Sequence, residues 1–265
     1  MANHIGVIGA GVMGEALIAA LIRSGVNPGD ISFAEKRNER AIELVDRYSI
    51  VHQDLITVVA NSTVLLLVVK PQDLPATLQE LAPHCLPETL VISFVAGKTI
   101  ASISAVLGDS VSVVRVMPNT PALLGLGASG YSFGENVNPQ MRAFVSTFLA
   151  ATGHAIEVDE SLQDAVTATS GSGPAYFFRF VEAMVDGAVA LGLSHEDAHA
   201  LTVQTIVGAA AMLEQSGDSP TTLREKVTSP NGTTAAAIAT FNSAGISEMV
   251  ASAMKAAAKR SQELS

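Results

Sequence analysis

Three glycines near the start of the chain have the spacing of a dinucleotide-binding turn. Gly9, Gly11 and Gly14 form a GxGxxG pattern between the apolar run His4–Ile8 and a helical stretch. In such a pattern the first glycine permits a tight turn, the second lets the backbone approach a pyrophosphate, and the third lets helix and strand pack closely. The free N–H groups at the start of the helix then face the pyrophosphate. The strand–turn–helix context favours this interpretation over a merely structural glycine-rich turn. The candidate contacts are Gly9, Ala10, Gly11, Val12, Met13 and Gly14.

Three charged residues that follow the next apolar run bear on the kind of dinucleotide. Glu35 lies 21 residues after Gly14 and has the place of an acid that accepts a hydrogen bond from a ribose 2′-hydroxyl, which favours NAD. Lys36 and Arg37 follow directly and could hold a 2′-phosphate, which favours NADP. A third interpretation is that all three are solvated residues at a helix start. We expect NADPH to be preferred, with NADH possible.

A loop in the last third of the chain has the residues of a carboxylate-binding helix start. Ser229 is an expected N-cap, Pro230 would occupy the first helical position, and Gly232 keeps the backbone accessible. A helix N-terminus of this kind offers free N–H donors to one carboxylate. An ordinary capped helix is the alternative interpretation.

Four longer motifs, taken in their order and spacing, resemble the pyrroline-5-carboxylate reductase family over essentially the whole chain. They are Val69-Lys70-Pro71-Gln72, Arg115-Val116-Met117-Pro118-Asn119-Thr120-Pro121-Ala122, Ser170-Gly171-Ser172-Gly173-Pro174-Ala175-Tyr176 and Val227-Thr228-Ser229-Pro230-Asn231-Gly232-Thr233-Thr234. The resemblance implies an N-terminal Rossmann domain and a C-terminal helical domain that interlocks with a second subunit. It also implies reduction of the cyclic imine 1-pyrroline-5-carboxylate to L-proline, usually with NADPH.

By motif position, the resemblance assigns further residues to the site. Val69, Lys70, Pro71, Ala96 and Gly97 should line the nicotinamide side of the cofactor cleft, and Asn119 should lie beside the nicotinamide. Substrate contacts are expected from Ser172, Gly173, Ser229, Pro230, Asn231, Gly232, Thr233 and Thr234, in a cleft completed by the other subunit.

The implied chemistry needs positioning more than acid–base groups, because a protonated imine is already electron-poor at carbon. A proton taken up from solvent would serve, and the motifs contain no obvious acid. The Thr234 hydroxyl could bond and orient the ring nitrogen, so Thr234 and Ser172 are the candidate catalytic residues.

The chain departs from the family pattern in two places. Asn231 replaces the first glycine of a loop that commonly reads SPGGTT, and asparagine tolerates a positive φ better than other residues with a side chain. Asp54-Leu55 stands where some members carry an Asn, so one adenosine contact is not expected here.

Composition limits the remaining function classes. Only 15% of residues are charged and the formal net charge is −10, so there is no basic excess to neutralise nucleic-acid phosphates. The apolar run Val64–Val69 is far shorter than the roughly 20 residues of a membrane-spanning helix, and no basic n-region precedes the first apolar stretch. Cys85 is the single cysteine, which excludes an intramolecular disulfide and favours a reducing, cytoplasmic setting.

Two kinds of element must position these residues. Five short apolar runs alternate with amphipathic helical stretches over residues 1–160, which predicts a doubly wound parallel sheet of the Rossmann type. The expected strands are His4–Ile8, Ile31–Phe33, Val64–Val69, Leu90–Ser93 and Val111–Val116, with helices that include Glu15–Arg23 and Asn38–Tyr48.

Residues 161–265 predict an all-α dimerisation domain. The expected helices are Ala175–Leu191, His195–Gln215, Thr221–Val227, Thr233–Phe241 and Ser247–Gln262. Glu182–Leu193 and Ala209–Met212 have few charges on any face, and a small domain has little interior in which to bury them. We therefore expect at least a homodimer, and possibly a larger assembly of dimers.

Two other activities compete with this interpretation. β-Hydroxyacid dehydrogenases also join a Rossmann domain to helices, but their catalytic lysine would fall at Phe177, so the proton acceptor is missing. His195-Glu196-Asp197-Ala198-His199 matches the HExxH motif of zinc peptidases. Ser194 and Asp197, however, predict a capping box that places this motif in the exposed first turn of a helix, so no metal is expected.

Overall fold

The computed structural model describes residues 4–264, which divide into two compact units. Unit 1 contains the chain up to Pro174 together with the residues from Ala256 onward, and unit 2 contains Ala175–Lys255. The expected change from α/β to all-α structure after residue 160 stays a prediction, because the two compact units are delimited at other positions. The two units are described separately below.

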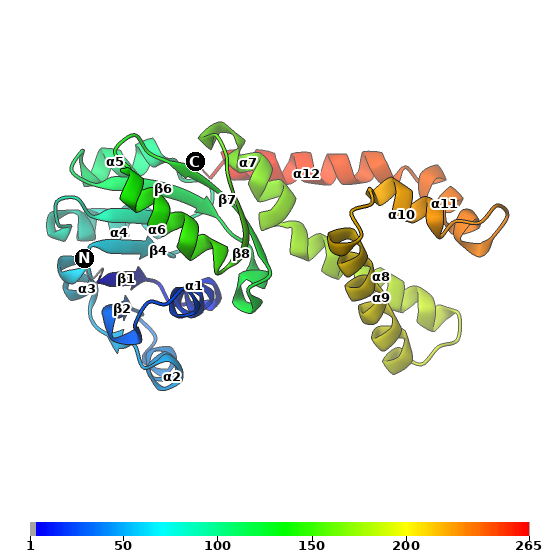
Figure 1. Cartoon of the computed structure of the whole chain (residues 1–265), viewed down its shortest axis with the longest axis horizontal. Coiled ribbons are helices and arrows are strands. Elements are labelled where there is room, and N and C mark those ends of the chain that lie inside the picture. Colours follow the sequence, from blue (N-terminus) through cyan, green and yellow to red (C-terminus); the bar gives the residue numbers. More distant parts are fainter. Residues whose placement is uncertain (1–3, 265) are drawn as a thin grey trace. The chain divides into compact units, whose positions relative to one another are not determined.

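Unit 1 is built on a mostly parallel sheet (Figure 1). Within residues 4–264 its strands are β1 (Ile5–Ile8), β2 (Ile31–Ala34), β3 (Val51–His52), β4 (Val64–Leu67), β5 (Leu90–Ser93), β6 (Ser112–Met117), β7 (Gly127–Phe133) and β8 (Gly153–Glu157). Their order is β3-β2-β1-β4-β5-β6-β7-β8. The first six are the two halves of a doubly wound fold, which confirms the expected fold class.

The sheet also contains three strands that were not expected. β3 has only two residues, and β7 reads GASGYSF, which lacks the apolar β-branched run of a buried strand. β7 runs antiparallel to β6, and β8 pairs parallel with β7. The expected strand Val64–Val69 was too long. The strand β4 ends at Leu67, and Val68 and Val69 belong to the loop that follows it.

Helices cover both faces of the sheet (Figure 1). In unit 1 they are α1 (Val12–Arg23), α2 (Asn38–Tyr48), α3 (Leu55–Asn61), α4 (Leu74–Leu81), α5 (Ile100–Leu107), α6 (Pro139–Ala150) and α7 (Gln163–Val166). Short 3₁₀ turns lie at Pro28–Asp30, Ala82–His84, Thr120–Leu124 and Glu160–Leu162, and a π-helical turn lies at Thr167–Gly171.

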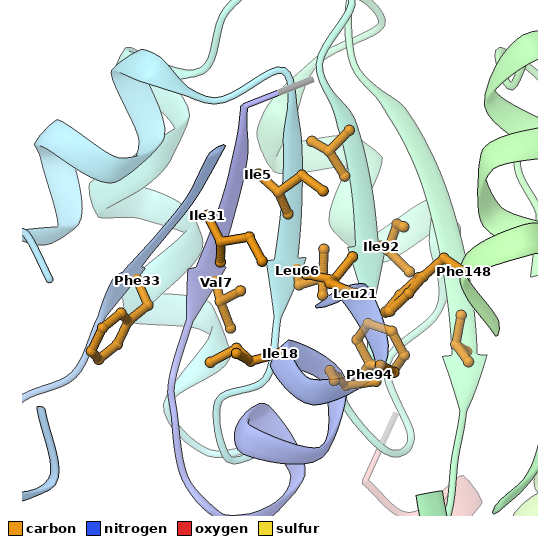
Figure 2. Close-up of a cluster of buried hydrophobic side chains, with 14 of the residues drawn as sticks. Ile5, Val7, Ile18, Leu21, Ile31, Phe33, Leu66, Ile92, Phe94 and Phe148 are labelled. Carbon is orange, nitrogen blue, oxygen red and sulfur yellow. The ribbon is translucent and has the colours of Figure 1, made fainter. Parts of the chain in front are cut away.

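The buried side chains form one core on each face of the sheet. The face packed by α1, α2 and α6 contains the larger core, in which Ile5, Leu21 and Phe33 are fully buried (Figure 2). Phe148 of α6 is 1% exposed and meets Phe94 edge to face, with ring centroids 6.3 Å apart. On the other face, α3, α4 and α5 bury a second cluster against β4, β5 and β6. The parallel strands are thereby fixed between two helical layers.

Unit 2 is helical, as expected. Its elements are α8 (Gly173–Ala190), α9 (His195–Gln215), α10 (Pro220–Lys226), α11 (Thr233–Ser243) and α12 (Ile246–Gln262), of which α8 begins and α12 ends in unit 1. Large apolar side chains remain exposed on these helices, including Phe177 of α8 at 63% and Leu201 of α9 at 60%. Such a surface is typical of a subunit interface.

No helix among residues 4–264 is both long and apolar enough to cross a membrane.

Replacing Phe148 with alanine should lower the free energy of unfolding by about 3–5 kcal/mol, because a buried ring is lost and a cavity remains. Urea denaturation at one fixed protein concentration measures this loss. Phe144→Ala is the matched control: this ring stacks on Phe148 but is only half-buried, so the loss should be smaller. Equal losses for the two variants would contradict the assignment of Phe148 to the core.

Candidate functional site

The glycine turn has the local geometry that its spacing predicts. Gly9 has φ +92°, and a Cβ built on it would lie 2.7 Å from the carbonyl oxygen of Val68. A Cβ on Gly14 would lie 2.3 Å from the carbonyl oxygen of Gly9, so α1 starts directly against the end of β1. A Cβ on Gly11 would meet nothing within 4 Å. The turn is therefore closed by contacts at Gly9 and Gly14 and open at Gly11, next to the start of α1.

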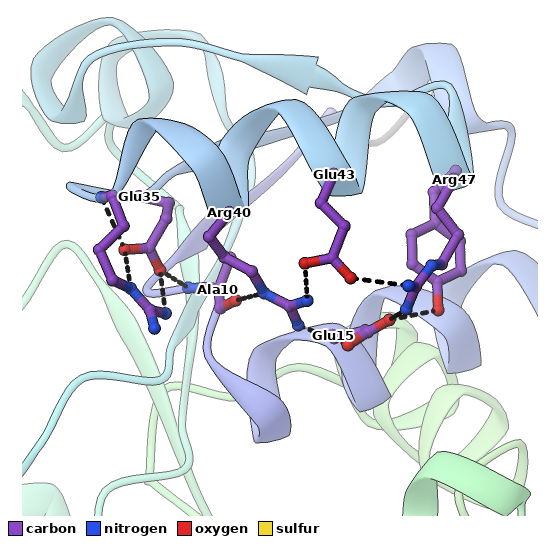
Figure 3. A network of polar contacts seen from close by, with 8 residues as sticks. Ala10, Glu15, Glu35, Arg40, Glu43 and Arg47 are labelled. Carbon is purple, nitrogen blue, oxygen red and sulfur yellow. Dashed lines mark hydrogen bonds and ion pairs between the residues drawn. The ribbon is translucent and has the colours of Figure 1, made fainter.

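Glu35 is fixed by the glycine turn and by Arg37 (Figure 3). The backbone N–H of Ala10 donates to Glu35 Oε2 at 3.3 Å. The Arg37 guanidinium donates to both carboxylate oxygens, at 3.0 and 3.1 Å, and the Arg37 backbone N–H donates to Oε1 at 3.0 Å. Hydrogen bonds from Arg37 outweigh the effect of burial and hold the pKa of Glu35 at about 2.

This arrangement corrects one interpretation of the charged triplet. The Glu35 side chain is only 8% exposed, so the triplet is not uniformly solvated. Lys36 is exposed, and the Arg37 side chain is 64% exposed despite its ion pair. The two cations are therefore available to an anion in solution, whereas the carboxylate is already paired.

A buried ionic cluster, which sequence reasoning missed, holds the same turn from its other side (Figure 3). Glu15 is 7% exposed and accepts from Arg40, Arg47 and the Tyr48 hydroxyl. Burial by itself raises the pKa of Glu15, but these hydrogen bonds together lower it below its ordinary value. Arg40 Nε also donates to the carbonyl oxygen of Ala10 at 3.2 Å. Glu35, which precedes α2, and Arg40 of α2 thus bind the N–H and the carbonyl oxygen of the same turn residue, Ala10.

The loops after β4 and β5 lie beside the glycine turn at the same sheet edge. Val68 donates its N–H to Ile8, and Phe94 donates its N–H to Leu67, both at 2.9 Å. The candidates Val69, Lys70 and Pro71 form the loop after β4, and Ala96 and Gly97 form the turn after β5. Parallel strands present their carboxyl ends at one edge, and dinucleotides bind across that edge where the strand order reverses.

Asn119, at the end of β6, has a structural task. It is 8% exposed. Its Nδ2 donates to the carbonyl oxygen of Ser170 at 3.1 Å, and its Oδ1 accepts the N–H of Ala128 at 2.9 Å. Ser170 belongs to the π-helical turn, a geometry that recurs at functional sites. Ser172 and Gly173 follow this turn at once. The Asn119 amide therefore anchors the backbone that carries the two substrate candidates of unit 1.

In unit 2, the expected helix start at Thr233 is confirmed, but the expected cap of that helix was wrong. Helix α11 begins at Thr233 with Gly232 as its N-cap, so Ser229 is not the N-cap and Pro230 is not the first helical residue. The N–H of Gly232 donates to the carbonyl oxygen of Ser229 at 3.0 Å, and Asn231 has φ +58°. Pro230 and Asn231 therefore occupy the central positions of a turn that requires a positive φ.

The asparagine at position 231 fits this turn, as its tolerance of positive φ predicts. A Cβ on Gly232 would lie 2.5 Å from Ser229 Oγ and 3.1 Å from the carbonyl oxygen of Ser229, so a side chain at this position would crowd the turn. Thr233 and Thr234 then form the first turn of α11, where backbone N–H groups have no helical partner.

Two remaining sequence features also have structural explanations. Asp54 caps α3 by accepting the N–H of Thr57 at 3.0 Å. Ser194 caps α9 by accepting the N–H of Asp197 at 3.1 Å, which confirms that the HExxH motif lies in a capped first turn. His195 and His199 line a groove of about 610 Å³ together with apolar side chains of α8 and α9. Among the described residues, no group of three or more His, Cys, Asp and Glu could hold a metal ion.

Comparison with protein families places both regions of the chain. Residues 160–264 match the family model described as pyrroline-5-carboxylate reductase dimerisation. Residues 4–97 match the model described as NADP oxidoreductase, coenzyme F420-dependent. A nicotinamide cofactor and homo-oligomerisation follow from these two assignments.

Comparison with individual proteins covers the chain almost completely. The pyrroline-5-carboxylate reductase of Pseudomonas aeruginosa is 44% identical over 98% of this chain and 96% of its own length. That of Methanosarcina acetivorans is 40% identical over 99% and 98%. The structure of the reductase from Coxiella burnetii has a TM-score of 0.91 at 34% identity and covers 100% of this chain and 99% of its own. The Plasmodium falciparum pyrroline carboxylate reductase, a crystal structure with NADP bound, has a TM-score of 0.88 at 28% identity and covers 99% and 98%.

Two alanine substitutions in the glycine turn should separate folding from cofactor binding. Gly14→Ala places a methyl group against the carbonyl of Gly9 and should lower the free energy of unfolding by about 1–3 kcal/mol. Gly11→Ala meets open space and should change that free energy by less than about 0.5 kcal/mol. The same Gly11→Ala variant should nevertheless bind NADPH at least about tenfold more weakly, because its methyl group occupies the space of the pyrophosphate.

Urea denaturation and titration calorimetry make the two measurements. Unchanged NADPH affinity in a stable Gly11→Ala variant would contradict the placement of the pyrophosphate.

Proposed function

Because the chain belongs to the pyrroline-5-carboxylate reductase family, we propose that it reduces 1-pyrroline-5-carboxylate to L-proline with a nicotinamide cofactor. The observation that carries this proposal is the identity of about 40% with reductases over their full length. Both substrate motifs are present, at residues 170–176 and 227–234. A β-hydroxyacid dehydrogenase is not favoured, because those relatives are reductases and Phe177 holds the place of the catalytic lysine.

We propose that the turn Gly9–Gly14 holds the cofactor's pyrophosphate and that the loops after β4 and β5 line its nicotinamide half. When bound, the cofactor supplies the hydride. The protein's part is to present unpaired backbone N–H groups at the start of α1 and to fix, by the packing of the turn, where the cofactor binds. The residues proposed for this role are Gly9, Ala10, Gly11, Val12, Met13, Gly14, Val69, Lys70, Pro71, Ala96, Gly97 and Asn119.

The ion pair at the end of β2 supports a preference for NADPH over NADH. The Glu35 carboxylate already accepts from Arg37 and from Ala10, so its acceptor sites are committed before a ribose hydroxyl arrives. Lys36 and the exposed guanidinium of Arg37 remain as partners for a 2′-phosphate. Glu35 is thus proposed as the anchor of Arg37 rather than as the acceptor of a 2′-hydroxyl.

The substrate is proposed to contact the residues that follow the π-helical turn of one subunit and the loop that starts α11 in its partner. The N–H groups of the first turn of α11 suit the carboxylate of the imine, and the Thr234 hydroxyl suits its ring nitrogen. Ser172 and Gly173 border the ring on the side of unit 1. No acidic side chain has to protonate the imine, since solvent can do so, and the chain's contribution is alignment of the imine carbon.

We further propose that each cleft combines residues of two subunits in a homodimer, which can assemble further. The exposed apolar side chains of α8 and α9 support a subunit interface in this unit. The single cysteine supports a reducing, cytoplasmic setting. The sequence division at residue 160 is proposed as the start of the dimerisation domain.

Activity is the first test of this proposal. Purified protein given NADPH and 1-pyrroline-5-carboxylate should form proline and lose absorbance at the nicotinamide band. Absence of turnover with both NADPH and NADH would contradict the proposed reaction.

Thr234→Ala serves as the matched variant for the substrate contact in that assay. It should lower turnover and raise the KM for the imine, with a loss of about threefold to tenfold, while the Kd of NADPH stays unchanged. A parallel loss of NADPH affinity would contradict a contact to the imine alone.

A second test concerns the choice of cofactor. Replacing Lys36 and Arg37 together with alanine should weaken NADPH by about tenfold or more, because charge-assisted contacts to a 2′-phosphate are lost. NADH affinity should hold or rise, since Glu35 is then free to accept the 2′-hydroxyl. Titration calorimetry with both cofactors measures the change. Arg142→Ala, which removes one exposed arginine elsewhere in unit 1, is the control for the loss of a surface cation. Equal losses of NADPH and NADH would contradict a contact to the 2′-phosphate, because the two cofactors differ only in that group.

A further inference from the structure

The C-terminal turn of α12 packs directly on the loop that follows β5. Gly97 in this loop has φ +76°, and a Cβ built on it would lie 2.6 Å from the Cβ of Leu264 and 2.9 Å from the carbonyl oxygen of Ser261. Both parts belong to unit 1. A glycine is therefore needed at this position because the end of the chain approaches the loop too closely for a side chain.

A polar network that includes Arg115 of β6 joins the same two segments. Ser261 is 3% exposed, and its hydroxyl donates to Asp164 Oδ1 at 2.6 Å. Asp164 and Glu160 both pair with the buried guanidinium of Arg115, at 3.8 and 3.4 Å. Glu160 Oε1 also accepts the N–H of Ile100 at 2.7 Å. The loop after β5 is thus held at Gly97 by the end of α12 and at its far end by a carboxylate of the same network.

The position of this loop in the fold gives the contact a functional meaning. The strands β4, β5 and β6 form the second mononucleotide half of the sheet, opposite the half that contains Glu35. Ligands of such sheets bind outside the carboxyl ends of the strands, where Phe94–Thr99 lies. This loop therefore borders the half of the cleft that takes the nicotinamide.

We infer that Ser261 and Leu264 are positioning residues for the nicotinamide half of the cofactor site. They act through the loop Phe94–Thr99, whose backbone they hold in place before the cofactor binds. The inference rests on the proposed use of a nicotinamide dinucleotide. Preorganisation of a loop raises affinity only for the ligand part that the loop contacts.

Comparison of two ligands tests this inference directly. NADPH contacts both halves of the cleft, whereas adenosine 2′,5′-diphosphate contacts only the adenosine half. Ser261→Ala and a chain that stops after Gln262 should each raise the Kd of NADPH by about threefold to tenfold. The Kd of adenosine 2′,5′-diphosphate should stay at the wild-type value. Gln262→Ala, an exposed neighbour on the same helix, is the matched control and should leave both constants unchanged.

The outcomes separate the inference from the proposed function. Titration calorimetry on the unaltered protein should first show binding of both ligands, and a failure to bind NADPH would overturn the proposed cofactor and the inference together. If the unaltered protein binds both, wild-type NADPH affinity in both variants would overturn the inference alone. A parallel loss of both ligands would also overturn it, because it would indicate a general loss of structure.

Discussion

The close approach of Gly14 to the carbonyl oxygen of Gly9 is the constraint on which the cofactor half of the structure depends. A separation that admits no side chain lets α1 begin directly at the end of β1, with its unpaired N–H groups at the sheet edge. The same turn presses Gly9 on the backbone of Val68, so β1 and β4 end side by side. The point where the strand order reverses is thereby fixed without any contribution from a side chain.

Side chains from the end of β2 and from α2 then hold the backbone of the glycine turn in place. Glu35 binds the N–H of Ala10, and Arg40 binds its carbonyl oxygen. Each of these charged groups has an opposite charge nearby, so neither is left buried and unpaired. The Glu35 carboxylate therefore accepts hydrogen bonds from both the glycine turn and Arg37, and Arg37 is one of the residues that bear on cofactor choice.

Much of the fold and of the cofactor half could be predicted from the sequence because the relevant patterns are local. The glycine turn, the apolar runs and the N-cap at Ser194 each depend on neighbours within a few residues, and the structure has all three. The long motifs also identified the family. β7 was missed because its glycines and serines lack strand periodicity, and its direction depends on pairing with β6.

The parts that were missed are of two kinds: a local turn that competes with a helix start, and contacts between residues far apart in the sequence. Ser229 and Pro230 suit a helix start locally, but a positive φ at Asn231 makes them part of a turn instead. Nothing near Glu15 in the sequence indicates that Arg40 and Arg47 will neutralise it. Arg115 offered a usable indication, since a charge within a run of buried valines requires a partner from elsewhere in the chain.

The π-helical turn at Thr167–Gly171 makes this part of the chain sensitive to length rather than to composition. A π-turn holds one residue more than the α-helical turn that it replaces, and here the N–H of Ser172 reaches back to the carbonyl oxygen of Thr167. Loss of any one of these five residues would restore α-helical winding and change the phase of the following side chains by about 100°. Ser172 and Gly173 would then leave the alignment that Asn119 sets, although every substrate motif would still be present. Deletions at this point should therefore be rarer than substitutions among functional members of the family.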